Sequence, residues 1–151
     1  MFDLIPQLDW RQSMLLPLLR PLDADPVREF RLDLFPPAAP EMVGVLRRLL
    51  SEMLKVAGAD SDGPCLILSE LVTNALLHGQ GAPTVVLELR CGQLYIAVAD
   101  GSTAAPVRRE PDVARTCGRG LDLVAALADD WGVELIGVCG KAVWAVAAVD
   151  H

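Results

Sequence analysis

Three polar residues spaced four positions apart occur in one apolar stretch of the chain: Glu70, Asn74 and His78. A helix turns by about 100° per residue, so side chains four residues apart are offset by only about 40°. The three therefore form one stripe about 80° wide on an expected helix. A carboxylate can accept a proton from an attacking hydroxyl or water. An amide oxygen can bind Mg²⁺, which commonly brings the phosphates of a nucleotide with it.

A polar stripe is also what the solvated face of any amphipathic helix shows, and the spacing alone does not separate the two interpretations. A solvated face in this chain would be expected to carry Arg, Glu or Asp. This stripe instead carries the only asparagine and one of the two histidines, and no Lys or Arg occurs between Lys55 and Arg90. The apolar residues of the helix are expected to face a sheet: Leu66, Ile67, Leu71, Ala75 and Leu77.

A second polar point ends the apolar segment "QLYIAVAD". Asp100 is followed there by Gly101 and Ser102. A carboxylate at the end of a buried strand can accept a hydrogen bond from the exocyclic amine of a ligand, and a glycine lets the backbone come close. The plain alternative is a turn, because Asp-Gly is a common turn dipeptide.

A third polar point is the pair Gly118 and Gly120, which flank Arg119 where a helix is expected to begin. Free amides and the positive end of the helix dipole make such a place suitable for a phosphate, and the arginine adds a cation. The P-loop pattern is absent, and the segment follows a loop rather than the parallel strand of a dinucleotide fingerprint.

The bulk composition limits the class of protein. The 151 residues suit one domain, and 52% apolar residues with a mean hydropathy of +0.37 exclude a disordered chain. The net charge of −7 argues against direct nucleic-acid binding, which depends on clustered Lys and Arg. No apolar run reaches the ~20 residues that span a bilayer, and the N-terminus lacks a signal-peptide pattern. We therefore expect a cytoplasmic protein with no membrane contact.

The four cysteines do not form a CxxC pair and have no histidine at ligand spacing, so free and mostly buried thiols are favoured over a zinc site. Hydrophobic periodicity predicts strands and helices in a fixed order. In chain order they are a strand at 27–35, a helix at 41–57, a helix at 61–78, strands at 83–91 and 93–100, a loop at 101–119, a helix at 120–131, a strand at 132–138, a turn at 139–141 and a strand at 142–149.

Two hairpins and three helices in this order predict an α+β fold. We expect a two-layer sandwich, with a mixed but mostly antiparallel sheet and the helices on one face. Residues 1–26 are rich in Pro and Leu without a clean period, and form an N-terminal extension to the domain at 27–151. A loop of 19 residues inside a compact domain is unusual and indicates either that the elements are wrongly assigned there or that the loop is a functional lid.

Taken together, these segments resemble the GHKL ATPase superfamily, and within it the bacterial anti-sigma-factor serine/threonine kinases. The stretch "SELVTNALLHG" is similar to the N box of that family, "VADGSTAAP" to a short first glycine box and "GRGLDLVAALADDWGV" to the second. "GKAVWAVAAV" is similar to the closing hairpin. The resemblance runs from about Arg28 to Val149 and implies a Bergerat-type sandwich that binds ATP and Mg²⁺ between the N-box helix and the lid.

The resemblance also implies roles for individual residues. Glu70 matches the general base, Asn74 the Mg²⁺ ligand and Asp100 the reader of the adenine amino group. The remaining positions that match nucleotide contacts are His78, Gly101, Ser102, Gly118, Arg119, Gly120, Leu121 and Lys141.

Two departures from the family pattern lower the expected affinity for ATP. Ala142 follows Lys141 where the family often has a hydroxyl residue, and Ser102 stands where longer relatives carry a second glycine. The implied function is an ATP-dependent serine/threonine kinase of the anti-sigma-factor type, which phosphorylates a small STAS-like antagonist and sequesters a sigma factor, in a family whose members are commonly homodimers. Two alternatives stay open: an ATP-binding switch without kinase activity, and a protein-interaction module that has lost the nucleotide.

Overall fold

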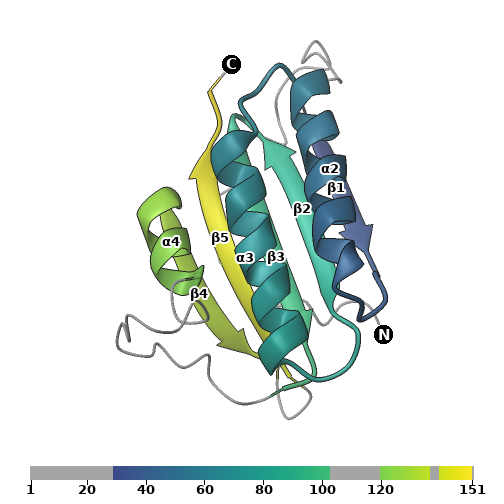
Figure 1. The fold of residues 1–151 in the computed structure, drawn as a ribbon. Helices are drawn as coiled ribbons and strands as arrows, with labels where there is room; N and C mark the ends of the chain where they lie inside the picture. Colours follow the sequence, from purple (N-terminus) through teal and green to yellow (C-terminus); the bar gives the residue numbers. More distant parts are fainter. Residues whose placement is uncertain (1–28, 103–119, 137–139, 151) are drawn as a thin grey trace.

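The computed structural model describes residues 29–102, 120–136 and 140–150. Five strands and three helices lie in these parts of the chain (Figure 1). In chain order they are β1 (Phe30–Leu34), α2 (Glu41–Val56), α3 (Asp62–His78), β2 (Thr84–Arg90), β3 (Gln93–Asp100), α4 (Gly120–Leu127), β4 (Asp130–Leu135) and β5 (Lys141–Ala148).

The strands form one sheet in the order β1-β2-β3-β5-β4. All four pairings between the described strands are antiparallel, so the sheet shows no parallel pair in these parts of the chain, although a mixed sheet was expected. Strands β3 and β5 are neighbours in the sheet, although α4 and β4 lie between them in the sequence. This pairing brings Asp100, the last residue of β3, opposite Lys141, the first residue of β5.

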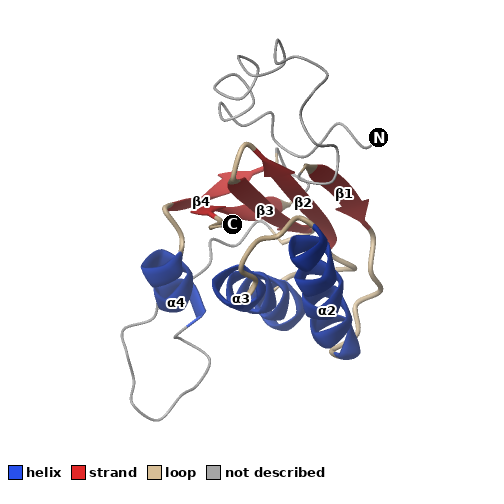
Figure 2. Ribbon diagram, turned by 90° about the horizontal axis from the view of Figure 1, so that it is seen from above, coloured by secondary structure: helices blue, strands red, loops and turns tan. Residues whose placement is uncertain are grey.

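The three helices cover one face of the sheet, and α3 lies between α2 and α4 (Figures 1 and 2). Side chains alternate between the two faces of a strand, so every second residue of each strand faces the helices. The helix-covered face of β3 carries Leu94, Ile96 and Val98, which belong to the main hydrophobic core. The expected two-layer α+β sandwich is therefore confirmed.

Helix α3 contributes most of the helical side of this core. Ile67, Leu68 and Val72 are completely buried. Leu66 and Leu77 were expected to face the sheet, but they are 40% and 60% exposed. The helical angle explains the error, because both positions lie within about 40° of Glu70 and thus on the outer side of the helix.

The ends of the first two helices follow their local sequence. Gly58, directly after the C-cap residue Ala57, has a φ of 75°, and its amide donates to the carbonyl of Lys55 at 3.0 Å. Glycine adopts this left-handed conformation without the cost that a Cβ imposes. Ser61 occupies the N-cap position of α3, but its side chain makes no capping hydrogen bond.

The last elements are shifted relative to the sequence prediction. Helix α4 ends at Leu127 rather than at 131, because Asp130 and Trp131 already pair with β5. Strand β5 begins at Lys141, which was expected in the turn. Periodicity does not locate these boundaries, because the apolar residues at 124–136 suit either a helix or a buried strand.

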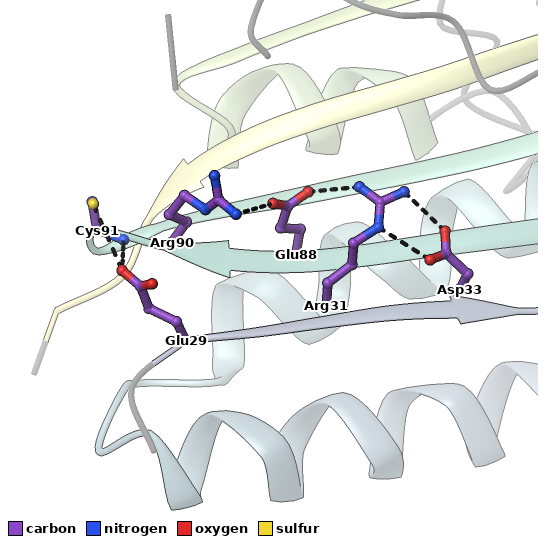
Figure 3. Close-up of polar contacts among 6 residues, drawn as sticks. All are labelled: Glu29, Arg31, Asp33, Glu88, Arg90 and Cys91. Atoms are coloured by element: carbon purple, nitrogen blue, oxygen red, sulfur yellow. Dashed lines mark hydrogen bonds and ion pairs between the residues drawn. The ribbon is translucent and has the colours of Figure 1, made fainter. Parts of the chain in front are cut away.

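The helix-free face of the sheet carries a row of charged side chains on β1 and β2 (Figure 3). Arg31 donates two hydrogen bonds to Asp33, at 3.0 and 3.1 Å, and one to Glu88 at 2.9 Å. Arg90 lies 3.5 Å from the other oxygen of Glu88, whose side chain is only 6% exposed. A carboxylate this buried requires partners, and the two arginines supply them.

The same face carries a smaller apolar cluster. Val86, Tyr95 and Ala97 are buried there, and Trp144 and Val146 pack against them. Gly132 lies opposite Trp144 in the ladder, and a Cβ at Gly132 would lie 2.8 Å from the indole ring. The glycine thus provides the space that the indole occupies.

Two further observations concern the cysteines and the membrane. Cys65 is buried, and this burial raises the pKa of its thiol above the ordinary value, whereas Cys91 is exposed. Cys117 and Cys139 lie outside the described residues. No helix in the described parts of the chain combines the length and the apolar character needed to cross a membrane.

The packing of α3 predicts unequal effects for two leucines of the same helix. Leu68→Ala should lower the free energy of unfolding by about 2–5 kcal/mol, because a completely buried side chain leaves a cavity. The matched change Leu77→Ala, at a 60% exposed position, should alter it by less than about 0.5 kcal/mol. Urea denaturation of both variants measures the difference, and equal losses would contradict this placement of α3.

Candidate functional site: the edge of α3 beside α4 and the strand ends

Glu70 and Asn74 lie on the edge of α3 that faces the start of α4. A Cβ built on Gly120, the first residue of α4, would lie 2.6 Å from Glu70 Oε2 and 3.5 Å from both polar atoms of the Asn74 side chain. The two polar residues and the glycine are therefore immediate neighbours. The N-box segment and the second glycine-box segment therefore meet at this point.

Neither polar residue is paired with another residue in the parts of the chain that the structure describes. Among the described residues, Glu70 and Asn74 make no hydrogen bond and no ion pair, and both are partly exposed. A carboxylate and an amide at a helix–helix contact are usually paired when they serve structure alone. Here none of the described residues takes up their hydrogen-bonding capacity.

The start of α4 adds a favourable environment for an anion at the same place. The first amides of a helix have no partner within the helix, and the helix dipole is positive at this end. Gly120 and Leu121 are both buried, and the Leu121 side chain belongs to the hydrophobic core, so its side chain does not face the site. Gly118 and Arg119 lie outside the described residues.

Asp100, the last residue of β3, forms the second part of the candidate site. It lies beside Gly79, which follows the C-terminal end of α3. Its carboxylate accepts a hydrogen bond from the backbone amide of Ser102 at 2.7 Å and lies 3.4 Å from Lys141 Nζ. The side chains of Lys141 and Asp100 are 5% and 2% exposed. A buried ion pair of this kind stabilises the fold little more than apolar residues would in the same place. Removal of one partner, however, leaves an uncompensated buried charge.

Two glycines allow the backbone to approach Asp100. A Cβ on Gly79 would lie 2.6 Å from Asp100 Cγ and would also collide with the carbonyl oxygen of Ala75. A Cβ on Gly140 would collide with the carbonyl oxygen of Asp100 itself. Gly101 donates its amide to the carbonyl of Gln80 at 2.8 Å, which fastens the end of β3 to the loop after α3.

The roles of Gly79 and Gly140 are not visible in the sequence. The letters "HGQG" and "CGK" signal turns, but only the packed structure shows that a side chain at these two positions would collide with Asp100 or with the end of its helix. His78, the last residue of α3, is exposed and makes no hydrogen bond or ion pair among the described residues.

One expectation about the closing hairpin changes with the strand register. Ala142 pairs with Ala99. Both lie on the helix-free face, because the residues next to them along the strands, Lys141 and Asp100, face the helices. A hydroxyl at position 142 would point away from the site. The absence of a hydroxyl there is therefore no reason to expect weak binding of ATP, whereas the substitution of Ser102 for a second glycine remains one.

The two parts of the site lie along one helix. Glu70 and Gly79 are nine residues apart, which corresponds to about 13 Å along the helix axis. This separation suits a ligand with a polar base at one end and a charged group at the other. The described residues include no group of three or more His, Cys, Asp or Glu that could hold a metal ion. Asn74 supplies one oxygen, and Mg²⁺ characteristically takes most of its other ligands from phosphates and water.

Comparison with known proteins agrees with this geometry. The histidine kinase-like ATPase domain family matches residues 36–146, which is 111 of the 151 residues and includes α3, the strand ends and α4. The chain therefore belongs to this family of ATPase domains, and ATP is the ligand that membership implies. The resemblance to the GHKL superfamily seen in the sequence is confirmed. No curated protein matches the chain.

Among solved structures, the chain is similar to the crystal structure of the RsbU and RsbW domains of Rv1364c from Mycobacterium tuberculosis. The TM-score is 0.58 and the sequence identity is 19%. The match covers 80% of this chain and 32% of that chain, so this protein spans about a third of its length. At this identity, the likeness shows a shared fold.

The contact between Gly79 and Asp100 predicts a stability loss at a position without unusual backbone angles. Gly79→Ala should lower the free energy of unfolding by about 1–3 kcal/mol, because the added methyl group meets both the end of its own helix and Asp100. Gly44→Ala is the matched control: nothing lies within 4 Å of its Cβ position, so it should stabilise α2 by about 0.5–1 kcal/mol. Thermal and urea unfolding measure both, and a neutral Gly79→Ala would contradict the close approach.

Proposed function

We propose that the chain binds MgATP along the edge of α3 and transfers its γ-phosphoryl group to a serine or threonine of a partner protein. The observation that carries this proposal is the contact of Glu70 and Asn74 with Gly120. There, two polar side chains that make no hydrogen bond or ion pair with the described residues meet the first residue of α4, which has no side chain. Membership of an ATPase domain family supplies the nucleotide.

Each residue has a distinct role in this proposal. Asp100 accepts a hydrogen bond from the amino group of adenine, and His78, one residue before Gly79, lies at this same end of α3. Asn74 holds Mg²⁺, which neutralises charge on the phosphates and helps to align the γ-phosphoryl group. Phosphoryl transfer depends mainly on such positioning and on charge neutralisation, to which the amides of α4 and Arg119 contribute.

Glu70 is the general base of the proposed reaction. Its carboxylate takes the proton of the attacking hydroxyl as the oxygen–phosphorus bond forms and the bond to the leaving ADP oxygen breaks. Glu70 makes no ion pair among the described residues, which suits a group that must contact the incoming hydroxyl.

The regulatory setting follows from the resemblance to anti-sigma-factor kinases and from the fold shared with a structure that contains an RsbW domain. The partner that accepts the phosphoryl group would be a small STAS-like antagonist, and a sigma factor would be the protein that is sequestered. The protein would act as a homodimer in the cytoplasm and regulate transcription without touching nucleic acid, in keeping with its net charge of −7.

An ATP-binding switch without kinase activity is the second candidate. The short first glycine box favours it, because Ser102 rather than a second glycine follows Gly101 and its amide is bonded to Asp100. In that case, ATP would gate the binding of a partner and no phosphoryl group would be transferred. Calorimetric titration with MgATP tests what both candidates require, and a transfer assay with [γ-³²P]ATP and a purified STAS-like antagonist separates them.

Removal of the proposed base separates chemistry from binding. Glu70→Gln should lower the rate of phosphoryl transfer by about 10²–10⁴-fold, while the Kd for MgATP changes less than about threefold. Glu52→Gln, at an exposed position of α2, is the control and should leave both unchanged. Single-turnover transfer and calorimetry give the two quantities, and a normal transfer rate in Glu70→Gln would show that another group takes the proton.

A methyl group at the helix contact should disturb the base without unfolding the protein. Gly120→Ala places a Cβ 2.6 Å from the present position of Glu70 Oε2, and this flexible side chain can move away. We expect a loss of stability below about 1 kcal/mol and a fall in the transfer rate of about 10-fold or more, because small displacements of catalytic groups are costly. Unchanged transfer would place the functional position of Glu70 away from α4.

A further inference from the structure

Lys141 is a buried cation for which the proposed function has no stated role. It begins β5 directly opposite Asp100 at the end of β3, and both side chains face the helices. Its Nζ lies 3.4 Å from each carboxylate oxygen of Asp100. Because Gly79 and Gly140 pack tightly around Asp100, the pair is held in place from two sides.

The hydrogen-bonding capacity of this pair is only partly used. Oδ1 of Asp100 accepts from the Ser102 amide at 2.7 Å and lies next to Lys141, whereas Oδ2 contacts Lys141 alone among the described residues. Each carboxylate oxygen has two lone pairs, and an ammonium group has three N–H donors. Counted against the described residues, Oδ2 therefore keeps one acceptor site and Lys141 keeps at least one donor, side by side.

We propose that Lys141 is a specificity-determining residue, whose ammonium donates a hydrogen bond to N1 of adenine while Asp100 Oδ2 accepts one from the 6-amino group. This inference rests on the proposed ATP site. The Watson–Crick edge of adenine presents a donor, the 6-amino group, next to an acceptor, N1. Proteins commonly recognise an exposed base by this edge. A site with a buried donor rejects an analogue that lacks the matching acceptor, because the donor is then left without a partner.

A purely structural role for Lys141, as the counter-ion of Asp100, makes a different prediction. The analogue 1-deaza-ATP carries a C–H in place of N1 and keeps the 6-amino group. If Lys141 is only a counter-ion, binding of ATP and binding of this analogue should affect its side chain equally. If Lys141 contacts N1, only the binding of ATP should affect its side chain.

The unaltered chain provides a direct readout, because it contains only two lysines, Lys55 and Lys141. Labelling with [¹⁵N]lysine gives two side-chain nitrogen resonances, and Lys55, which is 62% exposed, serves as the internal control. Saturation with MgATP should shift the Lys141 resonance, and saturation with Mg-1-deaza-ATP should leave it near its nucleotide-free position. The Lys55 resonance should stay unchanged with both nucleotides.

A variant gives the same comparison in affinity. In the unaltered chain, 1-deaza-ATP should bind about 10-fold or more weakly than ATP, the usual effect of losing a hydrogen bond from a charged donor. Lys141→Gln keeps a polar group of similar length without the charge, and Lys141→Met removes the donor; the ratio of the two Kd values should fall in Lys141→Gln and approach one in Lys141→Met. Lys55→Met is the control and should keep the ratio of the unaltered chain.

The outcomes separate this inference from the proposed function. Equal shifts of Lys141 with both nucleotides, no shift with ATP despite measurable heat of binding, or an unchanged Kd ratio in Lys141→Met would overturn the role of Lys141 and leave the ATP site intact. An absence of any heat of binding with MgATP would overturn both. The resonance measurement needs no variant, so it decides the matter even where Lys141→Met does not fold.

Discussion

The close approach of α3 to its neighbours, at positions without side chains, is the constraint on which the rest of the structure depends. Gly120 lets the start of α4 lie against Glu70 and Asn74, and Gly79 lets the end of α3 lie against Asp100. With a Cβ at either position, the helix and its neighbour would have to separate or the polar side chain would have to move. The polar edge of α3 is thereby bounded at both ends by backbone, which leaves its side chains available to a ligand.

The two carboxylates of the candidate site lie in different environments, and this difference divides the proposed work between them. Asp100 is almost completely buried and is held by Lys141 and a backbone amide, an arrangement that suits recognition, which requires a fixed acceptor. Glu70 is partly exposed and has no partner among the described residues, which suits a group that must take up and release a proton. The same residue class can serve both purposes because the local packing decides how buried each carboxylate is and which partners it has.

The sheet shows a corresponding difference between its two faces. The helix-covered face is apolar along most of its length and becomes polar only at the ends of β3 and β5, where Asp100 and Lys141 meet. The other face carries the row of Arg31, Asp33, Glu88 and Arg90 and a small apolar cluster (Figure 3). The register also places Ala142 on that face, so the polar groups that β3 and β5 contribute to the candidate site, Asp100 and Lys141, both lie on the helix-covered face.

Local sequence determined much of this protein: the order of strands and helices, the two-layer class, the polar stripe on α3 and the left-handed Gly58, because periodicity and backbone freedom act over a few residues. It did not determine the exposure of Leu66 and Leu77, the end of α4 or the start of β5. Nor did it pair Lys141 with Asp100 or show why residues 79 and 140 are glycines. These features depend on contacts between residues far apart in the chain, whose register and closeness are set only when the sheet and helices pack together.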